Sequence, residues 1–422
     1  MRKALIVLVA AVFALASAQE ITWITGNRGA DVDYAEAMAA QYMEANPDVT
    51  IEILQGPESA TDRLQQYLQF FEAGSGEVDI YEVDVIWPGD IAEHLVDLGQ
   101  YEQFANVNDE FFPAIVENNT VDGELVAIPY FTDAGLLYYR TDLLEKYGFD
   151  GAPETWTELE EMAQAIQDGE RDEGNQDFVG FVWQGNAYEG LTCDALEWVA
   201  SNGGGEIVSP EGVITVNNEQ AIAALEQAAS WVGTISPEGV TGFQEEDARS
   251  VWQAGNAAFM RNWPYAYGLT LEGDVGENFA VAPLPQGDGE GARSAATLGG
   301  WQLAVSQYSE NPDVAADFVA FLTSEEGQLS RALEQSNLPT RPAVYESEEL
   351  LSSPNAFMAE FLPVFQAAVA RPSTATAPNY GQASQLFFTA VHNVLTGEED
   401  AATALELLEL DLADLTGLPT AE

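Results

Sequence analysis

Cysteine, histidine and recognisable enzyme motifs are nearly absent from this chain of 422 residues. Its only cysteine, Cys193, has no partner for an intrachain disulfide. The two histidines, His94 and His392, do not form a two-histidine zinc motif. We also find no G-x-S-x-G elbow, Walker loop or dinucleotide fingerprint. The sequence therefore predicts no metal, no cofactor and no enzymatic activity.

Basic residues are scarce as well, with 13 Lys and Arg against 70 Asp and Glu, a formal net charge of −57. Lysine occurs only at Lys3 and Lys146. A surface this acidic repels nucleic acid and anionic membranes, so neither is an expected partner. Because molar salt screens such self-repulsion, we expect a host that lives at high salinity. Thermal unfolding that is insensitive to added salt would contradict this expectation.

Long apolar runs are confined to the start of the chain. Arg2 and Lys3 precede an apolar run at 4–15 and a small-residue cleavage site at 16–18. This pattern predicts a secretory signal peptide over residues 1–18 and a mature chain that begins at Gln19. Cys193 lies far from that cleavage site, so we expect no lipid-anchor cysteine. The predicted location is the periplasm or the extracellular medium.

Strand and helix patterns alternate through the first part of the mature chain. Apolar strand patterns occur at 21–25, 49–53 and 78–86, with helical patterns at 31–44 and 60–73. This order predicts a doubly wound, mostly parallel sheet that places ligands at the carboxyl ends of its strands. The later segments predict helices at 155–166, 221–232, 248–255 and 312–333, a polar loop at 168–177, a strand at 296–305 and a non-helical stretch at 370–380.

Seven segments in a fixed order carry a family resemblance. They are PYFTDAGLLYYRTDLLEKYG at 129–148, VDVIW at 83–87, FVWQG at 181–185, GNAAFMRNWPY at 255–265, APLP at 282–285, SAATLGGW at 294–301 and RP at 371–372. Together they resemble the extracellular solute-binding proteins of carbohydrate ABC importers, and among these the trehalose/maltose-binding proteins.

The resemblance implies a two-lobed α/β fold, the type II periplasmic-binding-protein fold. Each lobe would hold a mostly parallel sheet flanked by helices, and the chain would cross between the lobes three times. The implied first lobe comprises residues 19–131 and 296–338. The implied second lobe comprises residues 132–295 and 339–422.

A sugar site needs two kinds of side chain. Carboxylates and arginines form short, charged hydrogen bonds with ring hydroxyls, whereas aromatic rings cover the apolar C–H faces of the sugar. Asp31 and Asp84 follow predicted first-lobe strands, and Asp133 lies at the first crossing. In a chain with so few cations, Arg63 and Arg371 are the arginine candidates for opposite walls of a cleft.

The aromatic candidates lie beside turn-forming residues. Trp263 and Tyr265 flank Pro264, and Gly300 precedes Trp301 and permits a close backbone approach. Similar trehalose/maltose-binding proteins usually have Tyr at the position of Phe131, which predicts an altered sugar preference. The resemblance thus implies a ligand site formed by Asp31, Arg63, Asp84, Phe131, Asp133, Trp263, Tyr265, Gly300, Trp301 and Arg371.

The function implied is the extracytoplasmic substrate-binding component of an ABC transporter that imports α-linked gluco-disaccharides such as trehalose or maltose. The expected partners are the sugar and the transmembrane permease subunits, and the expected state is a monomer. Paired acidic residues also allow a second hypothesis, a secreted carbohydrate-active hydrolase or lyase. With 70 acidic residues in the chain, however, such pairs are a weak indication.

Overall fold

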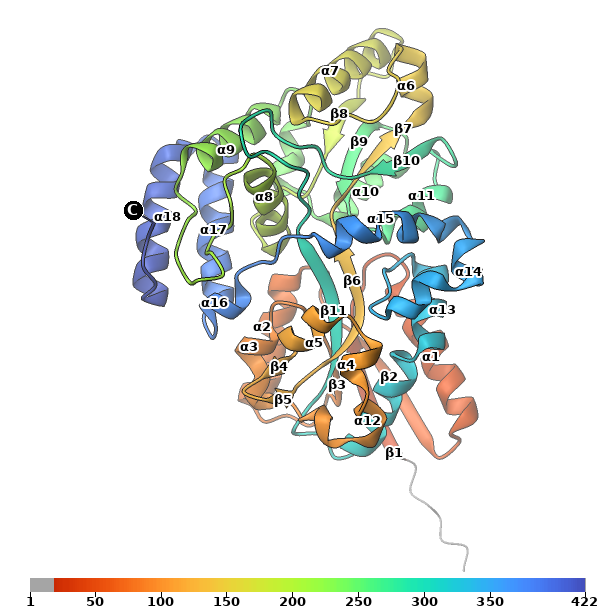
Figure 1. Cartoon of the computed structure of the whole chain (residues 1–422). Helices are drawn as coiled ribbons and strands as arrows, with labels where there is room; N and C mark the ends of the chain where they lie inside the picture. The colour runs from red at the N-terminus through yellow and green to blue at the C-terminus, as the bar shows by residue number, and fades with distance from the viewer. Residues whose placement is uncertain (1–18, 422) are drawn as a thin grey trace, which may run out of the picture.

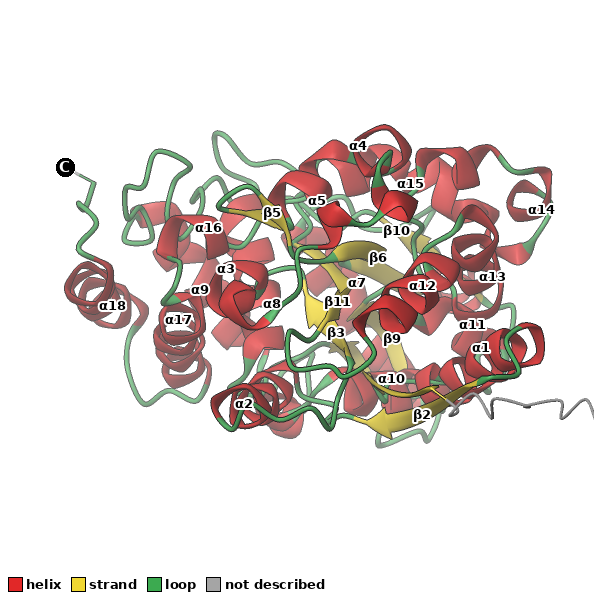
Figure 2. Ribbon diagram, turned by 90° about the horizontal axis from the view of Figure 1, so that it is seen from below, coloured by secondary structure: helices red, strands yellow, loops and turns green. Residues whose placement is uncertain are grey.

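The computed structural model describes residues 19–421, so the predicted signal peptide lies outside the described residues. Two lobes lie one above the other, and each is built around one main β-sheet (Figure 1). Helices surround the strands of both sheets (Figure 2). Between residues 19 and 421, no helix is long and apolar enough to cross a membrane.

The first sheet has the strand order β2-β1-β3-β11-β6. Its strands are β1 (Gln19–Thr25), β2 (Val49–Gln55), β3 (Ile80–Asp84), β6 (Ile128–Ala134) and β11 (Leu298–Val305). The helices of this lobe are α1 (Asp31–Ala45), α2 (Ala60–Glu72), α3 (Pro88–Ile91), α4 (Val107–Glu110), α5 (Pro113–Asn118), α12 (Pro312–Leu322) and α13 (Glu325–Gln335). A short hairpin, β4 (Thr120–Val121) and β5 (Glu124–Leu125), lies beside the sheet.

The second sheet has the strand order β10-β7-β9-β8. Its strands are β7 (Leu136–Arg140), β8 (Val179–Val182), β9 (Ala257–Asn262) and β10 (Phe279–Ala282). The helices of this lobe are α6 (Thr141–Tyr147), α7 (Trp156–Asp172), α8 (Glu189–Ser201), α9 (Glu219–Trp231), α10 (Glu245–Gln253), α11 (Ala266–Leu271), α14 (Glu348–Leu351), α15 (Phe357–Gln366), α16 (Ser373–Thr376), α17 (Tyr380–Leu395) and α18 (Ala401–Thr416). Helices α8, α9, α17 and α18 pack together on one side of this lobe (Figure 1).

The two-lobed α/β fold class is confirmed, and most strands of each sheet run in the same direction. In the first sheet β1 is parallel to β2 and β3, whereas β11 is antiparallel to both β3 and β6. In the second sheet β7 is antiparallel to β9 and β10, and only β8 and β9 are parallel. Both sheets thus contain antiparallel pairs, but in each sheet only one strand runs against the others: β11 in the first and β7 in the second. These two strands flank the lobe crossings, so their direction follows the path between the lobes and not a helical crossover.

Three helical segments differ from the sequence-based expectation. Helix α7 extends to Asp172, into the first part of the polar loop predicted at 168–177, because its polar residues lie on the solvent face while Gln167 remains buried. Helix α16 and the start of α17 lie inside the stretch predicted to be non-helical. Helix α8 was not predicted, since all of its residues are buried and it has no polar face to produce a 3.6-residue period.

The first crossing, between β6 and β7, depends on Gly135. A Cβ atom at this position would lie 2.1 Å from Glu197 Oε1 and 2.8 Å from Arg261 Nη2. Only glycine allows the backbone to pass this close to a buried ion pair. A later crossing segment, near Leu338, lies beside β6. The Leu338 carbonyl accepts a hydrogen bond from Thr132 N of that strand.

Candidate functional site

A small cavity lies between the two lobes. Its volume is about 30 Å³, roughly the share of one water molecule in the liquid. Six of the ten predicted site residues line this cavity: Asp84, Asp133, Trp263, Gly300, Trp301 and Arg371. The structure thus brings together acids, an arginine and two indole rings from segments that are far apart in the sequence.

Strand pairing explains how the first-lobe residues meet. Trp301 on β11 is the register partner of Asp84 at the end of β3, and Gly299 is the partner of Asp133 on β6. Because β11 lies between β3 and β6, both carboxylates flank the same strand. Gly300 has φ +125°, and a Cβ atom there would lie 2.6 Å from a backbone oxygen, so this position requires glycine.

Trp263 supplies the second-lobe side of the cavity and directly follows β9. Its backbone N–H donates a hydrogen bond to Asn262 Oδ1 at 2.8 Å, and Tyr138 donates from its hydroxyl to the Trp263 carbonyl at 2.8 Å. Its indole Nε1 donates to Glu245 Oε1 at 3.3 Å. These bonds fix the ring, which is 5% exposed, at the cavity wall.

Asp133 has an unusual electrostatic environment. Burial raises the pKa of this carboxyl to about 7, with Arg28 and Arg331 opposing the rise and Asp31 and Asp84 adding to it. Among residues 19–421, no group forms a hydrogen bond with its buried Oδ1 atom. A buried acceptor without a donor is costly. A ligand hydroxyl that enters the cavity would therefore stabilise this oxygen.

Arg371 joins the two lobes across the cavity. Its Nη2 atom lies 2.9 Å from Asp84 Oδ1 of the first lobe, and its Nη1 atom lies 2.8 Å from Glu189 Oε1 of the second lobe. Tyr380 and Ser384 also donate hydrogen bonds to Glu189. Burial raises the pKa of Glu189, and the Arg371 guanidinium opposes this rise.

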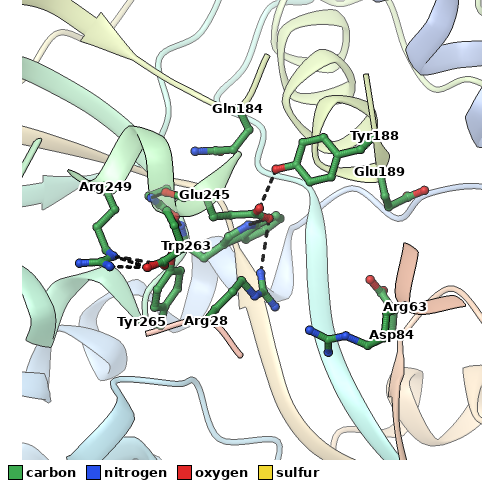
Figure 3. A network of polar contacts seen from close by, with 12 residues as sticks. Arg28, Arg63, Asp84, Gln184, Tyr188, Glu189, Glu245, Arg249, Trp263 and Tyr265 are labelled. Carbon is green, nitrogen blue, oxygen red and sulfur yellow. Dashed lines mark hydrogen bonds and ion pairs between the residues drawn. The ribbon is translucent and has the colours of Figure 1, made fainter. Parts of the chain in front are cut away.

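A second contact between the lobes involves residues that the sequence analysis missed. Arg28 Nη1 of the first lobe lies 3.4 Å from Glu245 Oε1 of the second lobe, and Tyr188 donates to Glu245 Oε2 at 2.6 Å (Figure 3). All three residues line the cavity. Arg28 lies three residues beyond the end of β1, and Asp84 is the last residue of β3, so both lie at the carboxyl ends of first-lobe strands. That position was the signal that could have identified it.

Three further predicted residues, Asp31, Phe131 and Tyr265, do not line this cavity. Asp31 forms an ion pair with Arg331 at 3.0 Å. The guanidinium of Arg331 also lies 4.3 Å from the ring centroid of Phe131. Tyr265 donates from its hydroxyl to Glu246 Oε1 at 2.6 Å.

Arg63, the fourth such residue, lies beneath the cavity wall. It is 0% exposed, and its guanidinium carbon lies 4.2 Å from the ring centroid of Trp301. Its Nη1 atom is 3.5 Å from Glu82 Oε1, which is also fully buried. Arg63 therefore packs against the Trp301 ring and does not line the cavity itself.

Across residues 19–421, no cluster of three or more His, Cys, Asp or Glu side chains is suited to hold a metal ion. The carboxylates and Arg371 of the cavity can form hydrogen bonds with a ligand, and its two indole rings can stack on one.

The chain is similar to proteins of known class. A model of the family described as bacterial extracellular solute-binding protein matches residues 27–329. A probable ABC transporter-binding protein of Deinococcus radiodurans is 50% identical over 374 residues, 87% of each chain. The structure of maltose-bound T. maritima MalE3 has a TM-score of 0.89 and 40% identity, and the match covers 94% of this chain and 100% of that chain.

More distant structures support the fold alone. The GacH receptor of Streptomyces glaucescens has a TM-score of 0.82 at 22% identity, and the match covers 95% of this chain and 99% of that chain. The matches agree with the two-lobed architecture. The chain belongs to the bacterial extracellular solute-binding protein family and is the solute-binding protein of an ABC transporter.

Proposed function

We propose that this protein binds α-linked gluco-disaccharides of the trehalose/maltose type and delivers them to an ABC importer. The observation that carries the proposal is the common cavity of Asp84, Asp133, Trp263, Trp301 and Arg371 between the lobes. Two indole rings offer faces for sugar C–H groups, and the charged side chains offer partners for hydroxyls. The 40% identity to maltose-bound T. maritima MalE3 supports a ligand of this class.

Hinge motion is the proposed mechanism. The described conformation is closed, with a cavity of about 30 Å³ that is too small for a sugar ring. The lobes, taken as residues 19–131 with 296–338 and residues 132–295 with 339–422, must separate for the ligand to enter. Contacts from both walls then favour closure, and the permease subunits would recognise the closed form. This mechanism includes no covalent step.

The charges of the cavity disfavour anionic ligands. Five carboxylates line it (Glu58, Asp84, Asp133, Glu189 and Glu245), against two arginines (Arg28 and Arg371). A phosphate group entering this cavity would meet an excess of like charge. A neutral ligand that donates hydroxyl hydrogens fits this set of acceptors better.

Isothermal titration calorimetry of the mature chain against a panel of sugars tests the proposal. We expect saturable binding of trehalose, maltose or both, with the ligand recovered intact. Binding of a polyol phosphate or a peptide, with no binding of any sugar, would refute it. Release of reducing ends from oligosaccharides would instead support the hydrolase hypothesis, which none of the similar proteins favours.

The remaining expectations concern the setting of the protein. We propose an extracytoplasmic monomer that works with two transmembrane permease subunits and does not bind nucleic acid. The net charge of −57 supports the last point and also the proposed high-salt habitat. Sedimentation of the mature chain and thermal unfolding across a salt series would test the monomer and the salt requirement, respectively.

A further inference from the structure

Two of the lobe crossings pass beside one buried carboxylate of the second lobe, Glu197 of α8. The first crossing passes it at Gly135, where a side chain would clash with Glu197 Oε1. The second crossing leads into β11, and its Thr297 N–H donates a hydrogen bond to the same Oε1 atom at 3.0 Å. These crossings continue β6 and β11, which run side by side between the lobes and end at the register pair Ala134 and Leu298 (Figure 1). Glu197 therefore contacts both crossings where they leave the first-lobe sheet.

A second bond attaches the later of these crossings to α8. The hydroxyl of Thr297 donates to the carbonyl of Cys193 at 2.9 Å, and Cys193 lies one turn before Glu197 on the helix. The Thr297 side chain is fully buried. The second crossing is thus bound to α8 through both its backbone and its side chain.

The same carboxylate also holds the indole ring of the second-lobe wall. Arg261 donates from Nε to Glu197 Oε2 at 2.8 Å and from Nη2 to Oε1 at 2.6 Å, and its guanidinium lies against Trp263. Asp194, on the same helix, pairs with the same guanidinium at 3.0 Å. Its other oxygen accepts from Gln184 N inside the second lobe. Of these two carboxylates, Glu197 is the one that joins the ring to a crossing.

The first lobe holds the opposite ends of the crossings through a different side chain. Gln328 of α13 is buried, and its amide donates to the carbonyl of Pro129 at 3.2 Å. Its oxygen accepts from the backbone N–H groups of Thr340 and Arg341 at 2.7 and 3.0 Å. The backbone between Gln328 on one side and Glu197 on the other is short, so bending between the lobes is confined to it.

We propose that Glu197 is a positioning residue for sugar binding. It does not line the cavity, so it acts through the crossings and through the ring of Trp263. By attaching both crossings to α8, it fixes where this ring arrives when the lobes close. Without that attachment the ring must be ordered during binding, and this ordering reduces the affinity. The inference rests on the proposed function and assigns a role within it to a residue that does not touch the ligand.

Two threonine variants test the attachment without changing any charge. Thr297→Val removes the bond to Cys193 and should weaken maltose binding about fivefold, the equivalent of one neutral hydrogen bond. Thr270→Val is the matched control, since Thr270 is equally buried and bonds Ala266 O and Trp252 Nε1 within the second lobe. It loses more hydrogen bonds than Thr297→Val but should keep the wild-type affinity. Thr297→Ser, which retains the hydroxyl, should restore binding. Calorimetry measures all four proteins.

Two acid variants test Glu197 itself. In Glu197→Gln the amide nitrogen faces a donor in either orientation, Arg261 Nε or Thr297 N, so we expect maltose binding to weaken about tenfold. Asp194→Asn is the control, because it removes the other carboxylate from the same guanidinium and leaves the crossing attached. It should reduce the affinity less than Glu197→Gln, even where chemical denaturation shows an equal loss of stability.

The proposal fails if Thr297→Val and Thr270→Val bind maltose equally well. An affinity loss in Asp194→Asn as large as that in Glu197→Gln would also overturn it. Amide hydrogen exchange of the ligand-free protein separates this inference from the function on which it rests. We expect peptides that contain Thr297 to exchange faster in Glu197→Gln than in Asp194→Asn. If wild-type protein binds no sugar, the proposed function fails, and equal exchange in the two variants would show that Glu197 does not attach the crossing either.

Discussion

In each wall of the cavity an indole ring packs against the guanidinium group of a buried arginine. The two walls differ in the number of carboxylates that bind this guanidinium. In the first lobe the ring centroid of Trp301 lies 4.2 Å from the guanidinium carbon of Arg63. Arg63 Nη1 lies 3.5 Å from Oε1 of one carboxylate, Glu82. In the second lobe the ring centroid of Trp263 lies 3.9 Å from the guanidinium carbon of Arg261. Here the guanidinium is bound by two carboxylates, Asp194 at 3.0 Å and Glu197 at 2.6 Å, and also by Gln184.

The difference indicates which wall is held more rigidly. Among the described residues, neither Nη atom of Arg63 has a hydrogen-bond partner, whereas both Nη atoms of Arg261 do. Glu197 also accepts from Thr297 N, in the segment that leads into β11 between the lobes. The second-lobe ring is therefore fixed to the hinge region, and the first-lobe ring retains more freedom. Four predictions test this comparison, from the largest expected effect to the smallest.

Replacing the two buried arginines should expose the difference in pairing. Arg261→Met leaves Asp194 and Glu197 buried without a cation, so we expect a loss of about 3–5 kcal/mol in the free energy of unfolding. Arg63→Met leaves one carboxylate, Glu82, whose pKa burial already raises, and should cost less. Chemical denaturation measures both values.

A surface pair provides the control for these variants. Arg140→Met removes a partly exposed ion pair with Asp142 and should cost at most about 1 kcal/mol. If Arg63→Met were as destabilising as Arg261→Met, the two walls would not differ in the way their contacts indicate.

Removing the rings tests whether both walls contribute to binding. We expect Trp263→Ala and Trp301→Ala each to weaken sugar binding by about 2 kcal/mol, roughly 30-fold, since buried aromatic residues dominate such sites. Calorimetry gives the affinity, and the Trp→Phe variants, which retain a ring, serve as controls. An effect confined to one of the two positions would mean that only that wall holds the sugar.

Asp133 should give the binding reaction a pH dependence. With a pKa of about 7, roughly one molecule in ten is ionised at pH 6 and nine in ten at pH 8. A hydroxyl donor favours the carboxylate, so the affinity should rise about tenfold between these pH values and then level off. Asp133→Asn should remove the dependence, and a wild-type profile that falls with rising pH would contradict the assignment.

The Arg28–Glu245 pair should have the smallest effect. At 3.4 Å this contact is longer than the Arg371 contacts at 2.8 and 2.9 Å, so we expect it to contribute about 1 kcal/mol to closure without ligand. Arg28→Met should increase the radius of gyration of the ligand-free protein in small-angle scattering. Lys146→Met, which breaks an exposed pair outside the cavity, is the control. Equal radii for Arg28→Met and wild-type protein would show that this contact does not hold the lobes together.

Part of the fold and the site could be predicted from local pattern and from family resemblance. The alternating strands and helices of the first lobe appear close to the predicted ranges, because one buried face gives each element a regular period. Asp84 and Asp133 could be placed near a ligand because they lie at strand ends and at a crossing. Helix α8 could not be predicted, because burial on all sides removes the pattern.

The sequence by itself determined the acidic character, the predicted order of elements in the first lobe and the residue types that a sugar site requires. Only the tertiary structure decided that Arg63 lies beneath Trp301, that Asp31 pairs with Arg331, and that Arg28 and Glu245 meet across the cavity. The physical reason is the separation along the chain of the residues that interact. Periodicity and turn chemistry act between neighbours in the chain, whereas these contacts join residues up to 300 positions apart. The first two form only when the first lobe folds, and the third forms only when the two lobes meet.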